Sequence, residues 1–149
     1  MIRIRIEAQE AITRLERTKG QLQNALFTAL VKSTALARET IIDNIKTGMK
    51  KNLGWPPFAP STIARKSKRG RSLYGLVDTG RMMTSVHESV SKTKLEGEVY
   101  PGVEYLKFHE LGTRKMRVRK TFEPVPKQVN RKITEIFKSE IAGALTHGL

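Results

Sequence analysis

A long run of regularly spaced apolar residues near the start of the chain constrains its fold most. From Ala8 to about Lys46, apolar side chains recur at three- and four-residue intervals, the period of one helix face. They are Ile12, Leu15, Leu22, Leu26, Ala29, Leu30, Ala37, Ile41 and Ile45. The pattern predicts an amphipathic helix about 50 Å long. Glycine destabilises a helix interior, so we expect a kink or break near Gly20 and the end of the helix at Gly48.

Shorter runs alternate between apolar and polar residues, which is the pattern of half-buried strands. Ile2, Ile4 and Ile6 alternate with arginines at the N-terminus. Two further runs, over residues 86–90 and 95–99, alternate on either side of Lys92-Thr93-Lys94. We therefore expect a first strand at residues 2–6 and a β-hairpin later in the chain.

A second amphipathic helix is expected at the end of the chain, after Pro124 and Pro126. Its apolar side carries Val129, Ile133, Ile136, Phe137, Ile141 and Leu145. Long helices at both ends and short strands between them predict an α+β fold. In this fold a long N-terminal helix and a C-terminal helix pack on a small, mainly antiparallel sheet, in one domain over residues 1–149.

The region between the first helix and the hairpin has a different composition. The run Gly54–Pro60 contains three prolines, which fit neither a regular helix nor a central strand. Residues 66–72 are basic and contain glycine and serine, so we expect a mobile basic loop over about residues 49–75. Within it Ser61 is expected to cap one short helical turn, and Asp78 to cap a helix that runs to about Ser85.

Charge is the most unusual property of the composition. The 28 lysines and arginines and 14 aspartates and glutamates give a net charge of +14, an excess that attracts nucleic acid or another acidic surface. Between Lys46 and Arg81, Asp78 is the only acid, and this clustering favours a basic face over scattered solubilising charge. The cations of that stretch are Lys46, Lys50, Lys51, Arg65, Lys66, Lys68, Arg69, Arg71 and Arg81.

The composition also excludes several classes of protein. The chain has no cysteine, so neither a disulfide framework nor a thiolate metal site is available. The N-terminal residues alternate in polarity, unlike a signal peptide. No stretch approaches the roughly 20 apolar residues that span a bilayer, so we expect no membrane partner.

The segment from Tyr105 to Phe122 combines an apolar helical turn with a basic run. Tyr105, Phe108 and His109 share one helix face, and Gly112 is expected to end this helix because glycine adopts cap conformations without steric cost. The following residues are expected to be extended and exposed. They are the cations Arg114, Lys115, Arg117, Arg119 and Lys120, with Met116 and Val118 between them.

We find no catalytic constellation, cofactor motif or metal motif. His109-Glu110 starts like a zinc-protease motif, but that motif needs a second histidine four residues after the first, where this chain has Thr113. A histidine satisfied within the core or at a helix cap is the favoured interpretation of His109. Asp78 is better explained as a helix cap than as a general base.

Two features of the basic region allow both a binding role and a structural role. Trp55 is expected to anchor its loop to the core or to a neighbouring subunit, although a single ring also stacks on a nucleic acid base. The cations Lys66, Lys68, Arg69 and Arg71 either face DNA or a protein partner or form a solvated surface.

Three stretches of the chain together resemble the tail-completion or virion morphogenesis proteins of long-tailed phages. Residues 54–66, 76–82 and 105–116 resemble the family patterns WxPLSPxT, LxDTGRL and YxxxHExGT in the same order. Phe58 stands where the family usually has leucine, a departure that we expect to change little. The resemblance covers about residues 52–145. The family's proline-containing arm, MPARPF, reads MRVRKTF here, over Met116–Phe122, so this arm lacks the prolines and is more basic.

The resemblance implies an α+β fold and a structural role without catalysis. It implies a ring, typically of six subunits, at the head-proximal end of the tail tube, which joins the tail tube protein to the head–tail connector. DNA passes through the lumen of such a ring, and the protein resides in the virion after assembly in the host cytoplasm. Structural roles are expected for Trp55, Asp78, Gly80, Tyr105, His109 and Gly112.

The arm from Gly112 to Phe122 is our candidate for the joint between subunits. A ring with one repeated contact needs a surface on each subunit that reaches its neighbour. We expect apolar side chains of the arm to pack on the adjacent subunit and its arginines to pair with acids there. The residues are Met116, Val118 and Phe122 for packing, and Arg114, Arg117 and Arg119 for pairing.

Two other functions remain as alternatives at this point. A basic nucleic-acid-binding protein unrelated to virion assembly would account for the charge. A hydrolase that uses His109 and Glu110 would require a bound metal.

Overall fold

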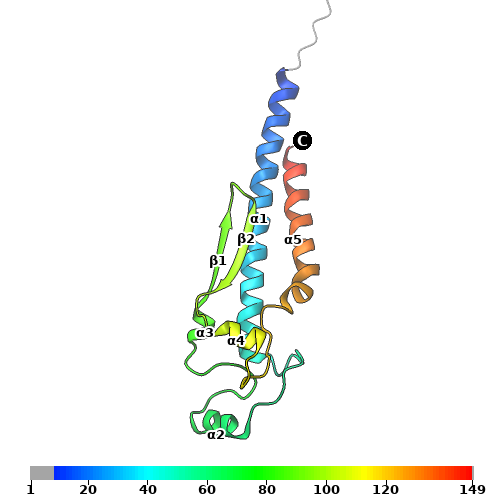
Figure 1. Ribbon diagram of the computed structural model, residues 1–149. Coiled ribbons are helices and arrows are strands. Elements are labelled where there is room, and N and C mark those ends of the chain that lie inside the picture. Colours follow the sequence, from blue (N-terminus) through cyan, green and yellow to red (C-terminus); the bar gives the residue numbers. More distant parts are fainter. Residues whose placement is uncertain (1–8, 149) are drawn as a thin grey trace, which may run out of the picture.

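The computed structural model describes residues 9–148 of the chain. Its two longest helices lie side by side and run in opposite directions, and the hairpin packs on the first of them (Figure 1). The elements are α1 (Gln9–Thr47), α2 (Pro60–Lys68), α3 (Arg81–Thr84), β1 (Val86–Ser91), β2 (Glu96–Pro101), α4 (Leu106–Leu111) and α5 (Val125–Gly148).

The long first helix is confirmed. Helix α1 has 39 residues, which corresponds to a length of about 58 Å at 1.5 Å per residue. It continues through Gly20 without the expected break and ends one residue before Gly48. The expected strand at residues 2–6 lies outside the described residues. None of the described helices is long and apolar enough to cross a bilayer.

The expected hairpin is also confirmed, and it completes the α+β fold. Strands β1 and β2 form a two-stranded antiparallel sheet in which Val86 pairs with Pro101 and Ser91 with Glu96. One face of the sheet covers α1, where Gly97 lies so close to Thr34 that an added Cβ would come within 2.2 Å of the threonine hydroxyl. Successive side chains of a strand point to opposite faces of the sheet, so the side chains of the other face point away from α1.

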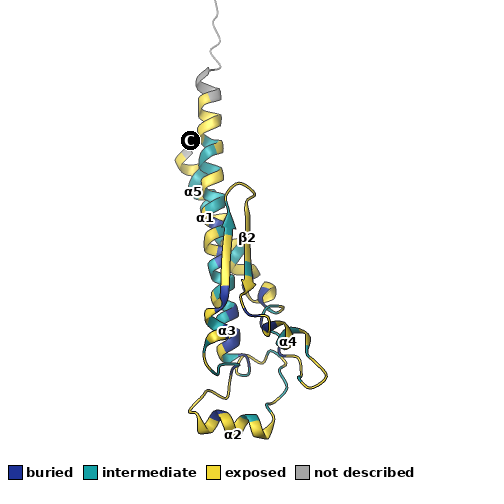
Figure 2. Cartoon of the chain, turned by 60° about the vertical axis from the view of Figure 1, so that its left-hand side comes forward, coloured by how far each residue is buried: buried dark blue, intermediate teal, exposed yellow. Residues whose placement is uncertain are grey.

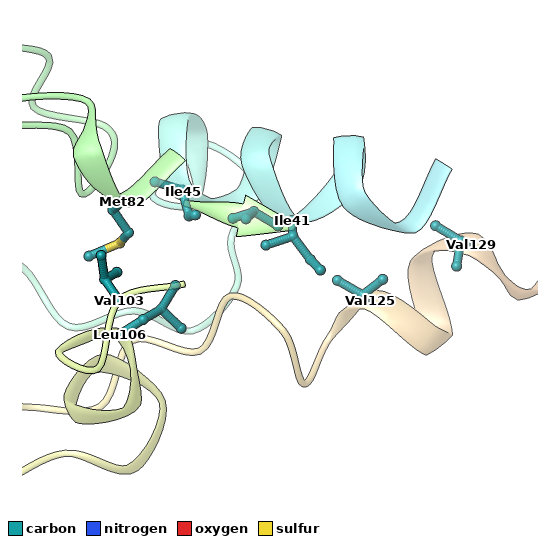
Figure 3. Packing of buried hydrophobic residues seen from close by; sticks show 8 residues of the cluster. Ile41, Ile45, Met82, Val103, Leu106, Val125 and Val129 are labelled. Carbon is teal, nitrogen blue, oxygen red and sulfur yellow. The ribbon is translucent and has the colours of Figure 1, made fainter. Parts of the chain in front are cut away.

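The hydrophobic core lies where the C-terminal part of α1 meets the other elements. Ile41 and Ile45 of α1 face Met82 of α3 and Val125 of α5, as Figure 3 shows. Buried residues concentrate in this region, whereas α2 is mostly exposed (Figure 2). The remaining buried members are Val86, Val103, Leu106 and Val129.

The short helices differ from the sequence expectations in their bounds. Helix α2 starts at Pro60 after Ala59, and it extends to Lys68, so part of the expected loop is helical and Ser61 does not precede it. Proline is well tolerated in a first helical turn because its missing N–H has no helical partner there. Helix α3 starts after Gly80, which has φ 83°, and Asp78 makes no capping hydrogen bond. Pro101 closes β2, and α4 begins only at Leu106.

Candidate functional site

A cavity of about 770 Å³ lies between α2, the segment around α3, helix α4 and the arm. Its wall brings together the three stretches that carry the phage resemblance. The segment before α2 contributes Pro57, Phe58 and Ala59, and α2 contributes Thr62, Arg65 and Lys66. The segment around α3 contributes Leu76–Met83. The third stretch and the arm contribute Tyr105, His109, Lys115, Met116, Arg117 and Arg119. Sequence reasoning identified each stretch separately but did not predict that they enclose one cavity.

Both cationic and apolar side chains line the cavity. Among the described residues that line it, Asp78 is the only acid. The cations of the wall are Arg65, Lys66, Arg81, Lys115, Arg117 and Arg119, and the apolar residues include Phe58, Val77, Met82, Met83 and Met116. Such a surface suits a ligand that carries both negative charge and apolar groups.

Lys66 is part of the cavity's framework, which corrects its expected role as a DNA-facing or partner-facing residue. Only 6% of its surface is exposed. Its Nζ donates hydrogen bonds to the carbonyl oxygens of Ser72 (3.0 Å), Gly75 (2.8 Å) and Val77 (3.0 Å). Burial lowers the pKa of Lys66, while the nearby carboxylate of Asp78 raises it. A single ammonium group thus holds residues 72–77 against α2.

Arg119 is also held inside its own chain, which corrects the expectation that it pairs with an acid of a neighbour. It is 8% exposed, and its Nη2 donates to the carbonyl oxygens of Pro56 (3.1 Å) and Pro57 (3.0 Å). Its guanidinium lies 4.7 Å from the ring centroid of Phe58. Burial, with a smaller effect of Arg117, lowers the pKa of Arg119. The proline-rich run therefore binds the arm.

Phe58 is a residue of the cavity wall to which the sequence analysis gave little weight. The Lys66 ammonium lies 5.2 Å from the centroid of the Phe58 ring, so the ring contacts both buried cations. An aromatic face attracts cations, whereas a leucine side chain does not. The signal in the sequence was the phenylalanine in place of the leucine that is usual in the phage pattern this stretch resembles.

Trp55 anchors its segment within its own chain, as the structural interpretation of this residue predicted. The indole Nε1 donates a hydrogen bond of 2.9 Å to the carbonyl oxygen of Lys120. The ring packs so tightly on Gly48 that a Cβ added there would lie 2.3 Å from it. Trp55 thus connects the end of α1 to the arm.

Glu110 of α4 fixes the base of the arm at Thr121 and Phe122. Its Oε1 accepts hydrogen bonds from the backbone N–H of Thr121 (2.5 Å), from the hydroxyl of Thr121 (2.6 Å) and from the backbone N–H of Phe122 (3.0 Å). The fully buried Asn44 of α1 donates to the carbonyl oxygen of Thr121 (2.9 Å) and to Oε1 of Gln128 (2.8 Å). This network joins α4, the arm, α1 and α5.

His109 lies in the cavity wall without a hydrogen-bond partner for its buried Nδ1. Burial lowers the pKa of His109, and the positive charge of Arg119 lowers it further, against the opposite effect of Glu110. Its main-chain oxygen accepts a 2.7 Å hydrogen bond from the N–H of Arg119. Within the described part of the chain, no group of three or more His, Asp or Glu residues is arranged to hold a metal ion.

The arm divides into an exposed tip and a base that packs on its own chain. At the tip, Thr113 and Met116 form a turn closed by a 2.8 Å hydrogen bond between the N–H of Thr113 and the carbonyl oxygen of Met116. Arg114, Arg117 and Val118 are exposed there, and Met116 is half-buried. Phe122 instead packs against the core beside α1, which corrects its expected place on a neighbouring subunit.

Gly112 ends α4 as expected, but with a different backbone conformation. Its φ of 74° and ψ of 171° lie in a region that is essentially restricted to glycine. An added Cβ would also approach Cγ2 of Val118 to 2.9 Å. Tyr105 precedes the helix as its N-terminal flanking residue and is exposed at the cavity.

The other three cations proposed to face DNA or a partner do not line the cavity. Lys68, Arg69 and Arg71 are all exposed, and Arg69 pairs with Asp78 at 3.3 Å. Asp78 therefore holds α2 near the segment that precedes α3, although it does not cap a helix. Gly80 supports this arrangement because its φ of 83° turns the chain into α3.

Comparisons with known proteins identify a relative but no function. No protein-family model matches the chain, and no solved structure matches it. The chain is 31% identical over 104 residues to the uncharacterized protein MJ0331 of Methanocaldococcus jannaschii. The matched region covers 66% of this chain and 77% of that protein. The chain therefore belongs to the same family as the protein MJ0331 of Methanocaldococcus jannaschii.

Proposed function

We propose that this protein is a structural virion component, a tail-completion or head–tail joining protein. One observation carries the proposal. The three stretches that resemble this class are separate in the sequence, yet they line one cavity, and the first and third of them also fix the base of one arm. These residues hold the arm in place and form no recognisable reaction centre. This arrangement favours a role in assembly over a role in catalysis.

The arm supports a role in joining subunits. Its base is fixed by Trp55, Glu110 and Arg119, whereas its tip presents exposed side chains beside the cavity. A rigid base reduces the conformational entropy that the tip loses on binding. The proposed joint therefore narrows from the whole arm to Arg114, Met116, Arg117 and Val118.

The proposed assembly is a ring, typically of six copies, at the head-proximal end of the tail tube. Its partners are then other copies of itself, the tail tube protein and the head–tail connector. The net charge of +14 suits a component whose lumen admits DNA. The protein acts in the virion after assembly in the host cytoplasm.

The test is the mass and shape of the purified protein. Native mass spectrometry and negative-stain electron microscopy at physiological salt are expected to show closed rings. Addition of tail tubes is expected to place these rings at one tube end. A protein that stays monomeric over the accessible concentration range and does not cap tubes would contradict the proposal.

A nucleic-acid-binding protein unrelated to virions is the second candidate. The exposed cations Lys68 and Arg71, with the net charge, favour it. Binding to phosphates weakens steeply as salt rises, for this candidate and for a ring that contacts DNA in its lumen. Tight, sequence-selective binding by a monomer would favour the second candidate over the joining protein.

A further inference from the structure

The exposed face of strand β2 carries two glutamates in an otherwise basic protein, and the turn beside it carries the exposed Lys92 and Lys94. Glu96, Glu98 and Tyr100 alternate along β2, so their side chains share one face of the sheet. All three are exposed, Tyr100 at 46%. Within the described part of the chain, neither glutamate forms an ion pair. This face therefore offers two free carboxylates beside an accessible aromatic ring.

The cavity has the complementary composition. Arg65, Arg81, Lys115 and Arg117 line it, are exposed, and form no ion pair within the described residues. Apolar side chains, among them Met116, lie between these cations. Two nitrogens buried in the same wall, Nδ1 of His109 and Nε of Arg119, also have no hydrogen-bond partner. The cavity thus suits carboxylates that are carried beside an apolar group.

The two surfaces lie apart on the molecule. The turn of the hairpin points away from α2, and the cavity lies at the α2 end (Figure 1). Two different, complementary surfaces on one chain produce a head-to-tail contact, which closes into a ring when the rotation between copies allows it. A contact between identical patches would place the acids, or the cations, of both copies against each other.

We propose that the cationic cavity binds the acidic hairpin face of a second copy of this chain. Glu96 and Glu98 pair with arginines of the cavity wall, and Tyr100 packs on its apolar residues. The inference rests on the proposed ring, for which it names the two contacting surfaces. Exposed ion pairs are individually weak and are screened by salt, so the contact is expected to weaken as salt rises.

The absence of cysteine from the chain permits a direct test by cross-linking. The two single-cysteine variants Glu98→Cys and Arg117→Cys are mixed and mildly oxidised. One of the two variants carries a mass tag, so that mixed dimers can be told from dimers of one variant. A disulfide forms only when the two Cα atoms come within roughly 7 Å. We expect mixed dimers several-fold above those formed by Lys138→Cys with Arg117→Cys, since Lys138 is exposed on α5 outside both surfaces.

A charge exchange provides the second arm of the test. Glu96→Lys with Glu98→Lys, and separately Arg65→Glu with Arg117→Glu, should each abolish self-association. A mixture of the two double variants should restore it, because each then offers the charge that the other needs. The matched control for the arginine pair, Lys132→Glu with Lys138→Glu, makes the same charge change on α5 and should associate like the wild type. Melting temperatures check that every variant is folded.

The outcomes separate this inference from the proposed ring. Rings that form without mixed dimers above the control level would overturn the named contact and leave the joining function standing. Mixed dimers without closed rings would support the contact and contradict the ring. Failure of the charge-exchanged mixture to associate, when the wild type does, would also overturn the contact.

Discussion

Buried cations form the framework of the cavity at the scale of single residues. Lys66 and Arg119 together donate hydrogen bonds to five main-chain carbonyl oxygens, and both lie against Phe58. A buried charge is tolerated when it is paired or fully hydrogen-bonded. Here the partners are neutral carbonyl dipoles rather than carboxylates, so the positive charge of the cavity is retained.

The first prediction concerns Lys66. Lys66→Met keeps the length of the apolar stem but leaves the carbonyl oxygens of residues 72, 75 and 77 without their donor. We expect the free energy of unfolding to fall by about 2–3 kcal/mol. Urea denaturation measures it, and Lys68→Met is the matched control in the same helix, since exposed Lys68 should change stability by less than about 0.5 kcal/mol. Equal effects would contradict the framework role.

The second prediction concerns pH. Folding lowers the pKa of His109 below its ordinary value of 6.5. Between the lowered pKa and 6.5 the unfolded chain binds more protons than the folded chain, so stability falls as the pH falls through this window. The slope from one proton is at most about 1.4 kcal/mol per pH unit. Urea unfolding between pH 7.5 and about 5 should show a weaker dependence in His109→Gln than in the wild type. An unchanged dependence would contradict the assignment.

The arm is the decisive feature at the scale of elements. Its base is bonded to other segments through Trp55, Glu110, Asn44 and its own Arg119. Among the described residues, the hydrogen bonds of its tip lie within its own turn. Segments with many buried hydrogen bonds unfold only when the whole protein unfolds, whereas exposed turns can unfold locally. The arm thus combines a fixed origin with a tip that is free to adapt to a partner.

The third prediction concerns the anchor of the arm. Gly48→Ala places a Cβ within 2.3 Å of the Trp55 ring, so the ring must move. We expect a loss of about 1–3 kcal/mol and a red shift of the emission of the single tryptophan. Gly20→Ala is the matched control, because nothing lies within 4 Å of its added Cβ. It should stabilise α1 by up to about 1 kcal/mol. A tryptophan spectrum unchanged in Gly48→Ala would refute the packing.

At the scale of the whole molecule, two surfaces that lie apart carry charges of opposite sign. Helices α1 and α5 lie side by side, and the hairpin that carries Glu96 and Glu98 covers one side of α1 (Figure 1). The cationic cavity lies at the end of the molecule where α2 is found (Figure 1). A separation of this kind orients copies head to tail and opposes contacts between like surfaces. Assembly is accordingly expected to depend on salt more than the fold itself does.

The fourth prediction separates assembly from folding with two substitutions in one arm. Val118 is 39% exposed at the tip, so Val118→Asp should keep the melting temperature but reduce self-association. Phe122 packs on the core, so Phe122→Asp should cost about 3 kcal/mol or more of stability. Thermal unfolding and native mass spectrometry of both variants measure the difference. Intact rings in Val118→Asp would show that the tip is not part of the joint.

The sequence alone determined the elements and the fold class of this protein. The helices at both ends and the hairpin follow from apolar spacing, which records how each segment buries its own face. The sequence analysis expected Trp55 to anchor its loop to the core or to a neighbouring subunit, and the structure shows its indole bonded to Lys120 of its own chain. The expected bounds of α2 and α3 were wrong: α2 begins at Pro60 and continues to Lys68, and α3 begins only after Gly80. Short helices bury few residues, so the apolar spacing of the sequence locates their ends poorly.

Only the tertiary structure decided which cations are free and which are buried. Arg117 and Arg119 look alike in the sequence, yet one lies exposed on the cavity wall and the other is buried against Pro56 and Pro57. The difference arises because the carbonyl partners of Arg119 lie more than 60 residues away. The alternation of side chains in a segment encodes which face is apolar, but the position of a distant hydrogen-bond acceptor is set only when the chain has folded.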